Sequence, residues 1–128
     1  MLNKTKFYIC SNCRNTAEMI YDTDIKLHCC GDEMQVPQPN TVEASAEKHV
    51  PEVLIRGDIV EVNVGSVNHP MEPVHWIEWV QLVTENGSQR RFLKPGQAPN
   101  VKFYLGDEKP LAVYAYCNLH GLWMKELN

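Results

Sequence analysis

The chain has 128 residues, 44% of them hydrophobic, and a formal net charge of -4, which suits one domain or a small domain followed by a larger one. Because acidic and basic residues are mixed and no apolar run approaches the ~20 residues of a membrane span, we expect neither nucleic acid nor a membrane as a partner. The first ten residues lack the apolar core of a secretory signal, so we expect a cytoplasmic protein whose five cysteines stay reduced and bind metal.

The first 36 residues form a cysteine-rich segment that is too short to be stabilised by apolar burial alone. Apolar and β-branched residues predict short strands at 6–9, 17–21 and 25–28. Residues 36–41 carry two prolines and few apolar side chains, which is typical of a linker. We therefore expect one small domain at 1–36 and a second domain at 37–128.

The second segment has the pattern of a β-rich domain. Residues 44–48 can form at most one helical turn. Apolar and polar residues alternate along 58–64 and 76–83, and the Asn86-Gly87 pair predicts a hairpin turn. Further strands are expected at 53–55, 90–93, 100–105, 111–116 and 122–125. About seven short strands with frequent turns predict a β-sandwich.

Four cysteines in the first segment have the spacing of a metal site. Cys10 and Cys13 form a C-x-x-C pair, and Cys29 and Cys30 are adjacent. Adjacent residues point to opposite faces of a strand, so the backbone must bend there for both thiolates to share a metal, and Gly31 makes such a bend easier. Four thiolates select iron or zinc, and the ligand type alone does not separate the two. A structural zinc site and a redox dithiol are the alternatives.

Four of the five histidines lie in motifs that favour a second metal site. The candidate ligands are His49, His69, His75, Cys117 and His120. Two prolines between His69 and His75 would hold the imidazoles in place before a metal arrives. Imidazoles with one thiolate suit iron, copper, nickel or zinc, but this set is larger than that of blue copper or structural zinc. Five ligands on iron leave one octahedral position vacant, which is typical of a reaction site. His28 has no such context and is interpreted as a bystander.

At these residues the chain resembles the desulfoferrodoxin family of two-iron superoxide reductases. The resemblance covers nearly the whole chain and rests on C-x-x-C…C-C, E-K-H-x-P, H-P-x-x-P-x-H-W-I and C-N-x-H-G-x-W. It implies a mainly β protein with a desulforedoxin-like domain and an immunoglobulin-like β-sandwich, usually as a homodimer. The activity implied is one-electron reduction of superoxide to hydrogen peroxide without dioxygen, which detoxifies superoxide. A rubredoxin-like protein is the implied electron donor.

The resemblance also implies a role for each site residue. One iron is held by Cys10, Cys13, Cys29 and Cys30, and a second by His49, His69, His75 and His120 in a plane with Cys117 as axial ligand. Lys48 matches a lysine that attracts superoxide, and Glu47 matches a glutamate that occupies the vacant position of the oxidised iron. Without the resemblance, these two residues would be interpreted as a surface pair of little energetic value.

Three further residue types carry expectations of their own. Arg14 stands where the family usually has glycine, at a position that favours a positive φ, so we expect local strain. Asn118 lies in the Cys-x-x-His loop, where backbone amides would tune the sulfur of Cys117. The tryptophans Trp76, Trp79 and Trp123 are expected to pack the core or the site rather than to relay electrons.

Three other functions are compatible with parts of the pattern. An electron-transfer or structural metalloprotein would have a saturated second site. A non-haem iron oxygenase would typically use two histidines and one carboxylate, and no carboxylate here has the spacing to complete such a set. A dismutase would produce dioxygen as well as peroxide.

Overall fold

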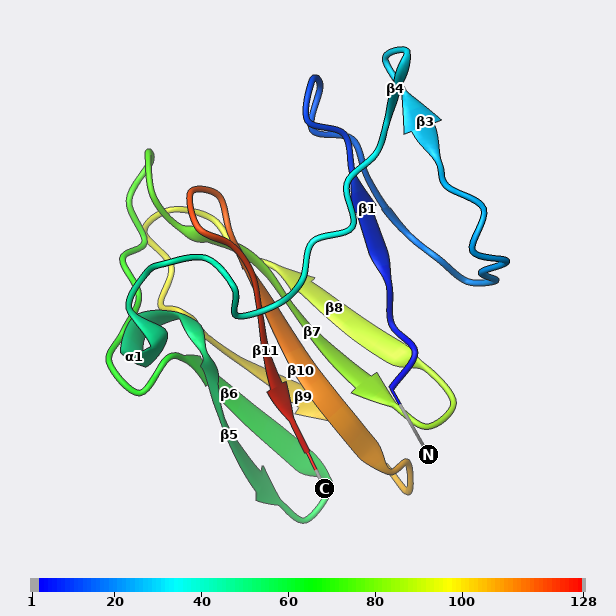
Figure 1. The fold of residues 1–128 in the computed structure, drawn as a ribbon. Coiled ribbons are helices and arrows are strands. Elements are labelled where there is room, and N and C mark those ends of the chain that lie inside the picture. The colour runs from blue at the N-terminus through cyan, green and yellow to red at the C-terminus, as the bar shows by residue number, and fades with distance from the viewer. Residues whose placement is uncertain (1–2, 128) are drawn as a thin grey trace. The chain divides into compact units, whose positions relative to one another are not determined.

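The structure, a computed structural model, describes residues 3–127 (Figure 1). It divides into two compact units, one formed by Lys4–Gln38 and the other by residues 39–127 together with Asn3. Eleven strands and one short helix are its regular elements, so the mainly β fold expected from the sequence is confirmed. Between residues 3 and 127, no helix combines the length and the apolar character that crossing a membrane requires.

The unit Lys4–Gln38 contains two short antiparallel hairpins. One pairs β1 (Phe7–Ile9) with β2 (Thr16–Glu18), and the other pairs β3 (His28–Cys29) with β4 (Asp32–Glu33). A bridge between Ile9 and Gln35 connects them. Tyr8, Cys10 and Met34 are the buried members of the apolar cluster. With so small a core, this unit depends on another source of stability, such as a metal.

Two strands of this unit are shorter than the sequence pattern predicts. The strand expected at 17–21 ends at Glu18, because β1 offers only three residues for pairing. Ile20 and Tyr21 are exposed beyond that point. The strand expected at 25–28 is reduced to its last residue and continues into Cys29. The length of the partner strand, rather than the apolar pattern alone, therefore limits the pairing in this unit.

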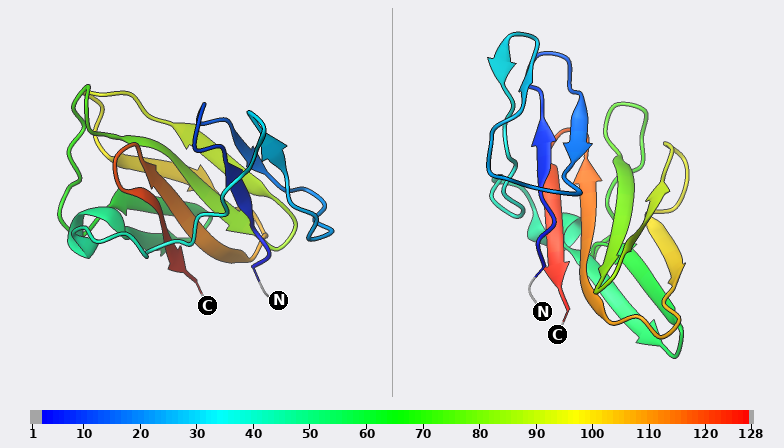
Figure 2. Two further views of the ribbon diagram at one scale, coloured as in Figure 1. Left: turned by 45° about the horizontal axis from the view of Figure 1, so that its top comes forward. Right: turned by 90° about the vertical axis from the view of Figure 1, so that its right-hand side faces the viewer.

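The second unit is a sandwich of two antiparallel sheets (Figure 2). One sheet has the order β11-β10-β7-β8 and the other has the order β5-β6-β9. The strands are β5 (Pro51–Arg56), β6 (Ile59–Val64), β7 (Ile77–Thr84), β8 (Ser88–Phe92), β9 (Asn100–Tyr104), β10 (Pro110–Cys117) and β11 (Gly121–Glu126). The bounds of each strand lie within two residues of those of a segment predicted from the sequence.

The core of the sandwich lies between the inner faces of the two sheets. Every second residue of β6 is buried, which explains the alternation seen in the sequence. These side chains meet apolar residues from β7, β9 and β10. The outer face of β7 is covered as well, because Trp79 stacks on Tyr116 at 5.7 Å between ring centroids and Arg90 lies over Trp79.

The connections that carry the second ligand set gather at one end of the sandwich. The helical turn α1 (Ala46–His49) directly precedes β5. Residues 65–76 join β6 to β7, and residues 118–120 join β10 to β11. Antiparallel pairing brings the start of one strand beside the end of its neighbour. Residues far apart in sequence therefore meet at this end.

Candidate metal centres

The residues predicted as metal ligands gather in two groups, one in each unit. The first group is Cys10, Cys13, Cys29 and Cys30, and the second is His49, His69, His75, Cys117 and His120. Within each group the candidate ligand atoms all lie within 4.8 Å of one another. His28 belongs to neither group.

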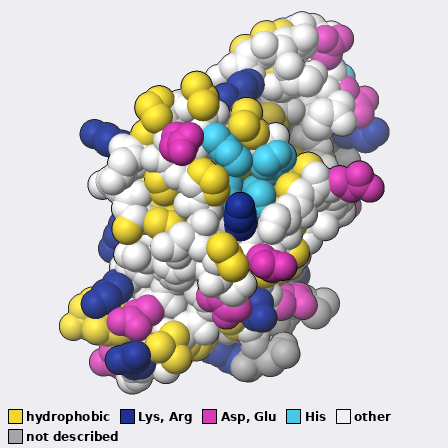
Figure 3. Space-filling model, turned by 90° about the vertical axis from the view of Figure 1, so that its left-hand side faces the viewer, with side chains coloured by type: hydrophobic (Ala, Val, Ile, Leu, Met, Phe, Trp, Pro, Cys, Tyr) yellow, Lys and Arg dark blue, Asp and Glu magenta, His cyan; other side chains and the backbone are white. Residues whose placement is uncertain are grey.

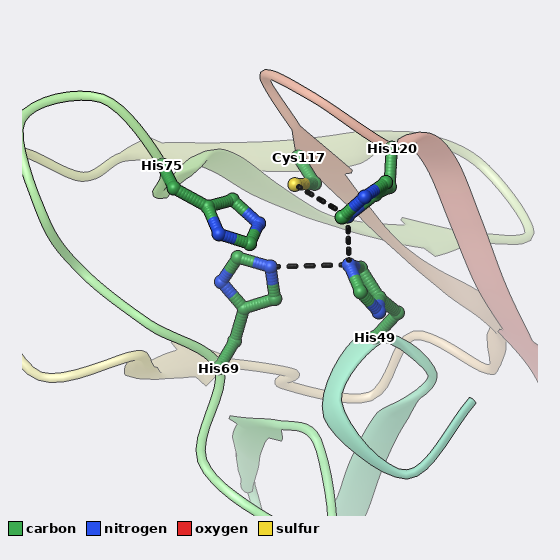
Figure 4. Close-up of side chains that lie close together, drawn as sticks. All are labelled: His49, His69, His75, Cys117 and His120. Carbon is green, nitrogen blue, oxygen red and sulfur yellow. Dashed lines mark hydrogen bonds between the residues drawn. The ribbon is translucent and has the colours of Figure 1, made fainter. Parts of the chain in front are cut away.

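The second group, which we call the His4Cys centre, is assembled from three separate segments of the chain (Figure 4). His49 ends α1, while His69 and His75 come from the connection between β6 and β7. Cys117 ends β10, and His120 lies in the turn before β11. His49, His69 and Cys117 are buried, whereas His75 and His120 are partly exposed.

Backbone carbonyl groups orient the rings of His49 and His69. The Nδ1 atom of His49 lies 2.6 Å from the carbonyl oxygen of Ser45, and that of His69 lies 2.6 Å from the carbonyl oxygen of Pro70. Because a carbonyl oxygen only accepts hydrogen bonds, we assign the ring proton to Nδ1 in both residues, which leaves a lone pair on each Nε2. These two Nε2 atoms are 3.1 Å apart. A cation bound by both would remove the repulsion between their lone pairs.

The other members of the centre point to the same place. The Nδ1 atom of His120 lies 3.1 Å from Nε2 of His49 and 3.9 Å from Sγ of Cys117. The Nε2 atom of His75 is buried and has no hydrogen-bond partner among residues 3–127. A buried polar atom without a partner is energetically costly, and a metal ion would satisfy it. Four imidazole nitrogens and one thiolate suit a transition metal such as iron rather than magnesium or calcium.

The protonation states of the His4Cys centre also fit a metal. Burial lowers the pKa of His49, His69 and His75, and for His69 it lowers the pKa to about 4. These imidazoles are therefore neutral near pH 7 and can bind a metal without first losing a proton. Burial raises the pKa of the Cys117 thiol, although backbone amides of His120 and Leu119 oppose that effect. The sulfur thus needs a bound cation to be a stable thiolate.

A loop that the sequence did not single out supports α1. The backbone amide of Val67 donates to the carbonyl oxygen of Glu47 at 2.9 Å, and Oγ of Ser66 donates to the same oxygen at 3.3 Å. A Cβ atom on Gly65 would lie 2.5 Å from that carbonyl oxygen and 2.7 Å from the carbonyl oxygen of Val50. Glycine is therefore required for α1 to approach this loop.

Trp123 packs against the centre from the side of β11. Its ring stacks on His49 with 4.7 Å between centroids, and its Nε1 donates to the carbonyl oxygen of His120 at 3.0 Å. The side chain is only 2% exposed. Trp123 therefore contacts two histidines of the centre at once, which confirms the expectation that it packs the site.

The His4Cys centre reaches the surface on one face of the molecule. Figure 3 shows histidine side chains emerging there among hydrophobic side chains and beside a basic one. Lys48 and Glu47 are both exposed on α1 next to His49. The charge of Lys48 contributes, after burial, to lowering the pKa of His49 and His75. Its electric field therefore acts on the centre although the side chain lies in solvent.

The four-cysteine group has the bent backbone that its sequence demands. Cys30 and Gly31 both adopt positive φ values, of 54° and 78°. This bend lets Sγ of Cys29 lie 3.9 Å from Sγ of Cys30 and 3.6 Å from Sγ of Cys13. Arg14 also has a positive φ, of 66°, as expected from the glycine usual at this position.

Backbone and side-chain amides donate to the cysteine sulfurs. The amide of Cys13 lies 3.5 Å from Sγ of Cys10 and, with the amide of Asn12 and the neighbouring thiols, lowers the pKa of that thiol to about 6. Asn15, which the sequence did not single out, donates to Cys13 from its backbone at 3.5 Å and to Cys29 from its side chain at 3.7 Å. In contrast, the neighbouring thiols raise the pKa of Cys30 to about 12. Full ionisation of the group therefore requires a metal cation.

Comparison with known proteins identifies the relatives of this chain. The sequence model of the desulfoferrodoxin family matches residues 41–126. The desulfoferrodoxin of Nitratidesulfovibrio vulgaris is 42% identical over 126 residues, which cover 98% of this chain and 99% of that protein. The desulfoferrodoxin of Syntrophotalea carbinolica is 43% identical, with 98% of this chain and 99% of that protein covered.

Solved structures give the same result. The superoxide reductase of Treponema pallidum has a TM-score of 0.80 and 36% sequence identity, and the match covers 97% of this chain and 100% of that one. The one-iron superoxide reductase of Giardia intestinalis has a TM-score of 0.56 and 31% identity, over 64% of this chain and 98% of that one. From its sequence, its fold and its two ligand groups, the chain belongs to the desulfoferrodoxin family.

Proposed function

We propose that the chain is a superoxide reductase, which converts superoxide, one electron and two protons into hydrogen peroxide and releases no dioxygen. The observation that carries this proposal is the convergence of four imidazoles and one thiolate on one point that opens to the surface. Membership in the desulfoferrodoxin family and similarity to superoxide reductases support it. The biological role that follows is detoxification of superoxide.

The protein carries two iron centres. We assign one iron to Cys10, Cys13, Cys29 and Cys30, and the other to the His4Cys centre. When bound in the His4Cys centre, ferrous iron supplies the single electron that the reduction needs. The contribution of the chain is to hold the donor atoms in place, to attract the anion and to admit protons from solvent.

Lys48 is proposed to guide superoxide to the site. Its exposed ammonium group lies on α1, one residue before His49. Superoxide is an anion, so a positive charge beside the open face raises its local concentration and the rate of encounter. The protein as a whole has a net charge of -4, which makes a local cation more important for capture.

Glu47 is proposed to occupy the open position in the oxidised state. It is exposed and lies two residues before His49 on the same helical turn. A carboxylate binds a ferric ion more strongly than a ferrous ion, because the charge on the metal is higher. Its departure on reduction would free the position for superoxide.

The two units are proposed to have separate roles. Residues 1–36 would form the desulforedoxin-like iron domain, and residues 37–128 would form the reductase domain. We further propose a rubredoxin-like electron donor, a homodimeric assembly and a cytoplasmic location. The family resemblance supports the donor and the assembly.

The proposed function is tested by mixing the reduced, iron-loaded full chain with superoxide under anoxic conditions. We expect one molecule of peroxide per superoxide consumed, oxidation of the His4Cys iron and no dioxygen. A dismutase would instead give half as much peroxide together with dioxygen. An electron-transfer protein with a saturated site would not accelerate superoxide loss and would not bind azide or cyanide.

A further inference from the structure

Asn118 connects the loop of Cys117 to the segment that carries His75. Its backbone amide donates to the carbonyl oxygen of Trp76 at 3.2 Å. Its side-chain Oδ1 accepts from the amide of Trp76 at 2.9 Å, and its Nδ2 donates to the carbonyl oxygen of Val74 at 3.0 Å. Both functional groups of the side chain are therefore used on the two residues that flank His75.

His75 differs from the buried histidines in how its ring is held. His49 and His69 each donate a ring proton to a backbone carbonyl group. The described residues offer the ring of His75 no comparable carbonyl partner, and its buried Nε2 has no partner at all. Its backbone pairs with Glu72 through hydrogen bonds of 2.9 Å and 3.0 Å. The direction of this ring consequently depends on the position of the backbone around it.

We propose that Asn118 is a positioning residue that fixes His75 relative to Cys117, so that imidazole and thiolate bind the metal as one preformed unit. This inference rests on the proposed function only in its assignment of His75 and Cys117 as iron ligands. Asn118 follows Cys117 directly and is partly buried, so its three hydrogen bonds carry the position of the sulfur to the loop of His75. Asn118 need not touch the metal or the substrate.

The physical consequence concerns metal affinity. Without the side chain, the amide of Trp76 and the carbonyl oxygen of Val74 lose their partners, and the segment between them gains freedom. Binding iron would then have to order His75 again, and residues behind the ligands typically change metal affinity by about 10- to 100-fold. The loss of iron affinity should come from the contribution of His75 to binding, and not from that of the other ligands.

A double-mutant cycle with ferrous iron tests this inference without superoxide. Affinity is measured on the full chain by competition with a chelator under anoxic conditions, for the wild type, Asn118→Ala, His75→Ala and the double variant. We expect Asn118→Ala to weaken binding at the His4Cys centre by about 10-fold or more, and by less than about threefold when His75 is already absent. An equal loss in both backgrounds would overturn the proposal.

Two further variants separate positioning from general destabilisation. Asn118→Ser keeps a polar side chain but is too short to reach both Val74 and Trp76, so it should weaken iron binding as Asn118→Ala does. Asn86→Ala removes a side chain that donates to Glu108 near the opposite end of β7, and it should leave iron affinity unchanged. Wild-type affinity in Asn118→Ser, or a loss in Asn86→Ala equal to that in Asn118→Ala, would contradict the proposal. A wild type that binds iron but fails to reduce superoxide would overturn the proposed function alone.

Discussion

The Nε2 atoms of His49 and His69 lie 3.1 Å apart, while each ring directs its Nδ1 proton to a backbone carbonyl group. Between two neutral imidazoles this arrangement is unfavourable, because the lone pairs of their Nε2 atoms face each other. The fold therefore holds the two rings in a geometry that a bound cation would stabilise, and the stability of the protein should depend on its metal.

Metal removal provides the first prediction. Chelation of both irons should lower the thermal unfolding temperature, because binding to the native state alone stabilises that state. The unit Lys4–Gln38 has the smaller core and should lose its structure first. Calorimetry of iron-loaded and iron-free protein measures both effects, and adding ferrous iron back should restore the transition. Identical transitions with and without iron would contradict this view of both centres.

The pH dependence of the iron-free protein follows from the buried histidines. Burial lowers the pKa of His69 from 6.5 to about 4 and also lowers the pKa of His49 and His75. Between pH 6.5 and about pH 4 the unfolded chain binds more protons than the native chain. The free energy of unfolding should therefore fall as the pH decreases from about 6.5 to about 4. Chemical unfolding at several pH values measures this slope. His69→Gln should flatten it, and an unchanged slope in that variant would contradict the assignment.

Removal of the Lys48 charge should slow the capture of superoxide. Lys48→Ala is expected to lower the second-order rate by about tenfold and to weaken its dependence on ionic strength, whereas Lys48→Arg should keep both. Pulse radiolysis measures these rates. Lys102→Ala is the matched control, because Lys102 pairs with Glu61 on the outer face of the β5-β6-β9 sheet. Equal rates for Lys48→Ala and the wild type would refute the steering role.

The two centres should be separable by mutation. Cys13→Ser removes one ligand of the four-cysteine group and leaves the His4Cys group intact. We expect the absorption of the first iron to be lost while the reduced protein still consumes superoxide at the wild-type rate. Metal analysis, visible spectra and pulse radiolysis on the same sample check this. Loss of superoxide reduction while the second iron is still bound would show that the first centre takes part in the reaction.

Replacing Arg14 by glycine should stabilise the first unit. Arg14 has a φ of 66°, a conformation that costs a residue with a side chain roughly 1 kcal/mol more than glycine. Its backbone amide donates to the carbonyl oxygen of Cys10 at 2.9 Å, a bond that Arg14→Gly retains. Thermal unfolding followed by the absorption of the first iron measures the gain. A lower unfolding temperature would show that the arginine side chain contributes contacts worth more than this strain.

The sequence predicts much of the sandwich because apolar residues recur at every second position along its strands, where they face the core. The Asn86-Gly87 turn and the alternation along β6 and β7 depend only on local chemistry, and the structure has strands where they predict them. The extension of the strand to Tyr21 was wrong, because its partner β1 is short. The length of a paired strand depends on its partner strand elsewhere in the chain, and the local sequence pattern of one strand does not contain that information.

The candidate site shows the same division. The ligand types and their spacing in the sequence identify both groups of side chains that the structure brings together. Several contacts that hold these ligands were missed, namely those of Gly65 and Asn15 and the side-chain hydrogen bonds of Asn118. Their roles arise because separate loops approach each other closely in the fold. The spacing of residues within one segment does not predict such an approach.

The His4Cys ligands all lie between residues 49 and 120, within a single unit, and the four cysteines all lie within the other. Neither metal shares a donor atom with the opposite unit. A chain lacking residues 1–36 would therefore keep every atom of the reductase centre, and the one-iron protein of Giardia intestinalis aligns with just 64% of this chain. Gene fusion or deletion can thus add or remove the unit that carries the four cysteines during evolution without any change to the ligands of the His4Cys centre.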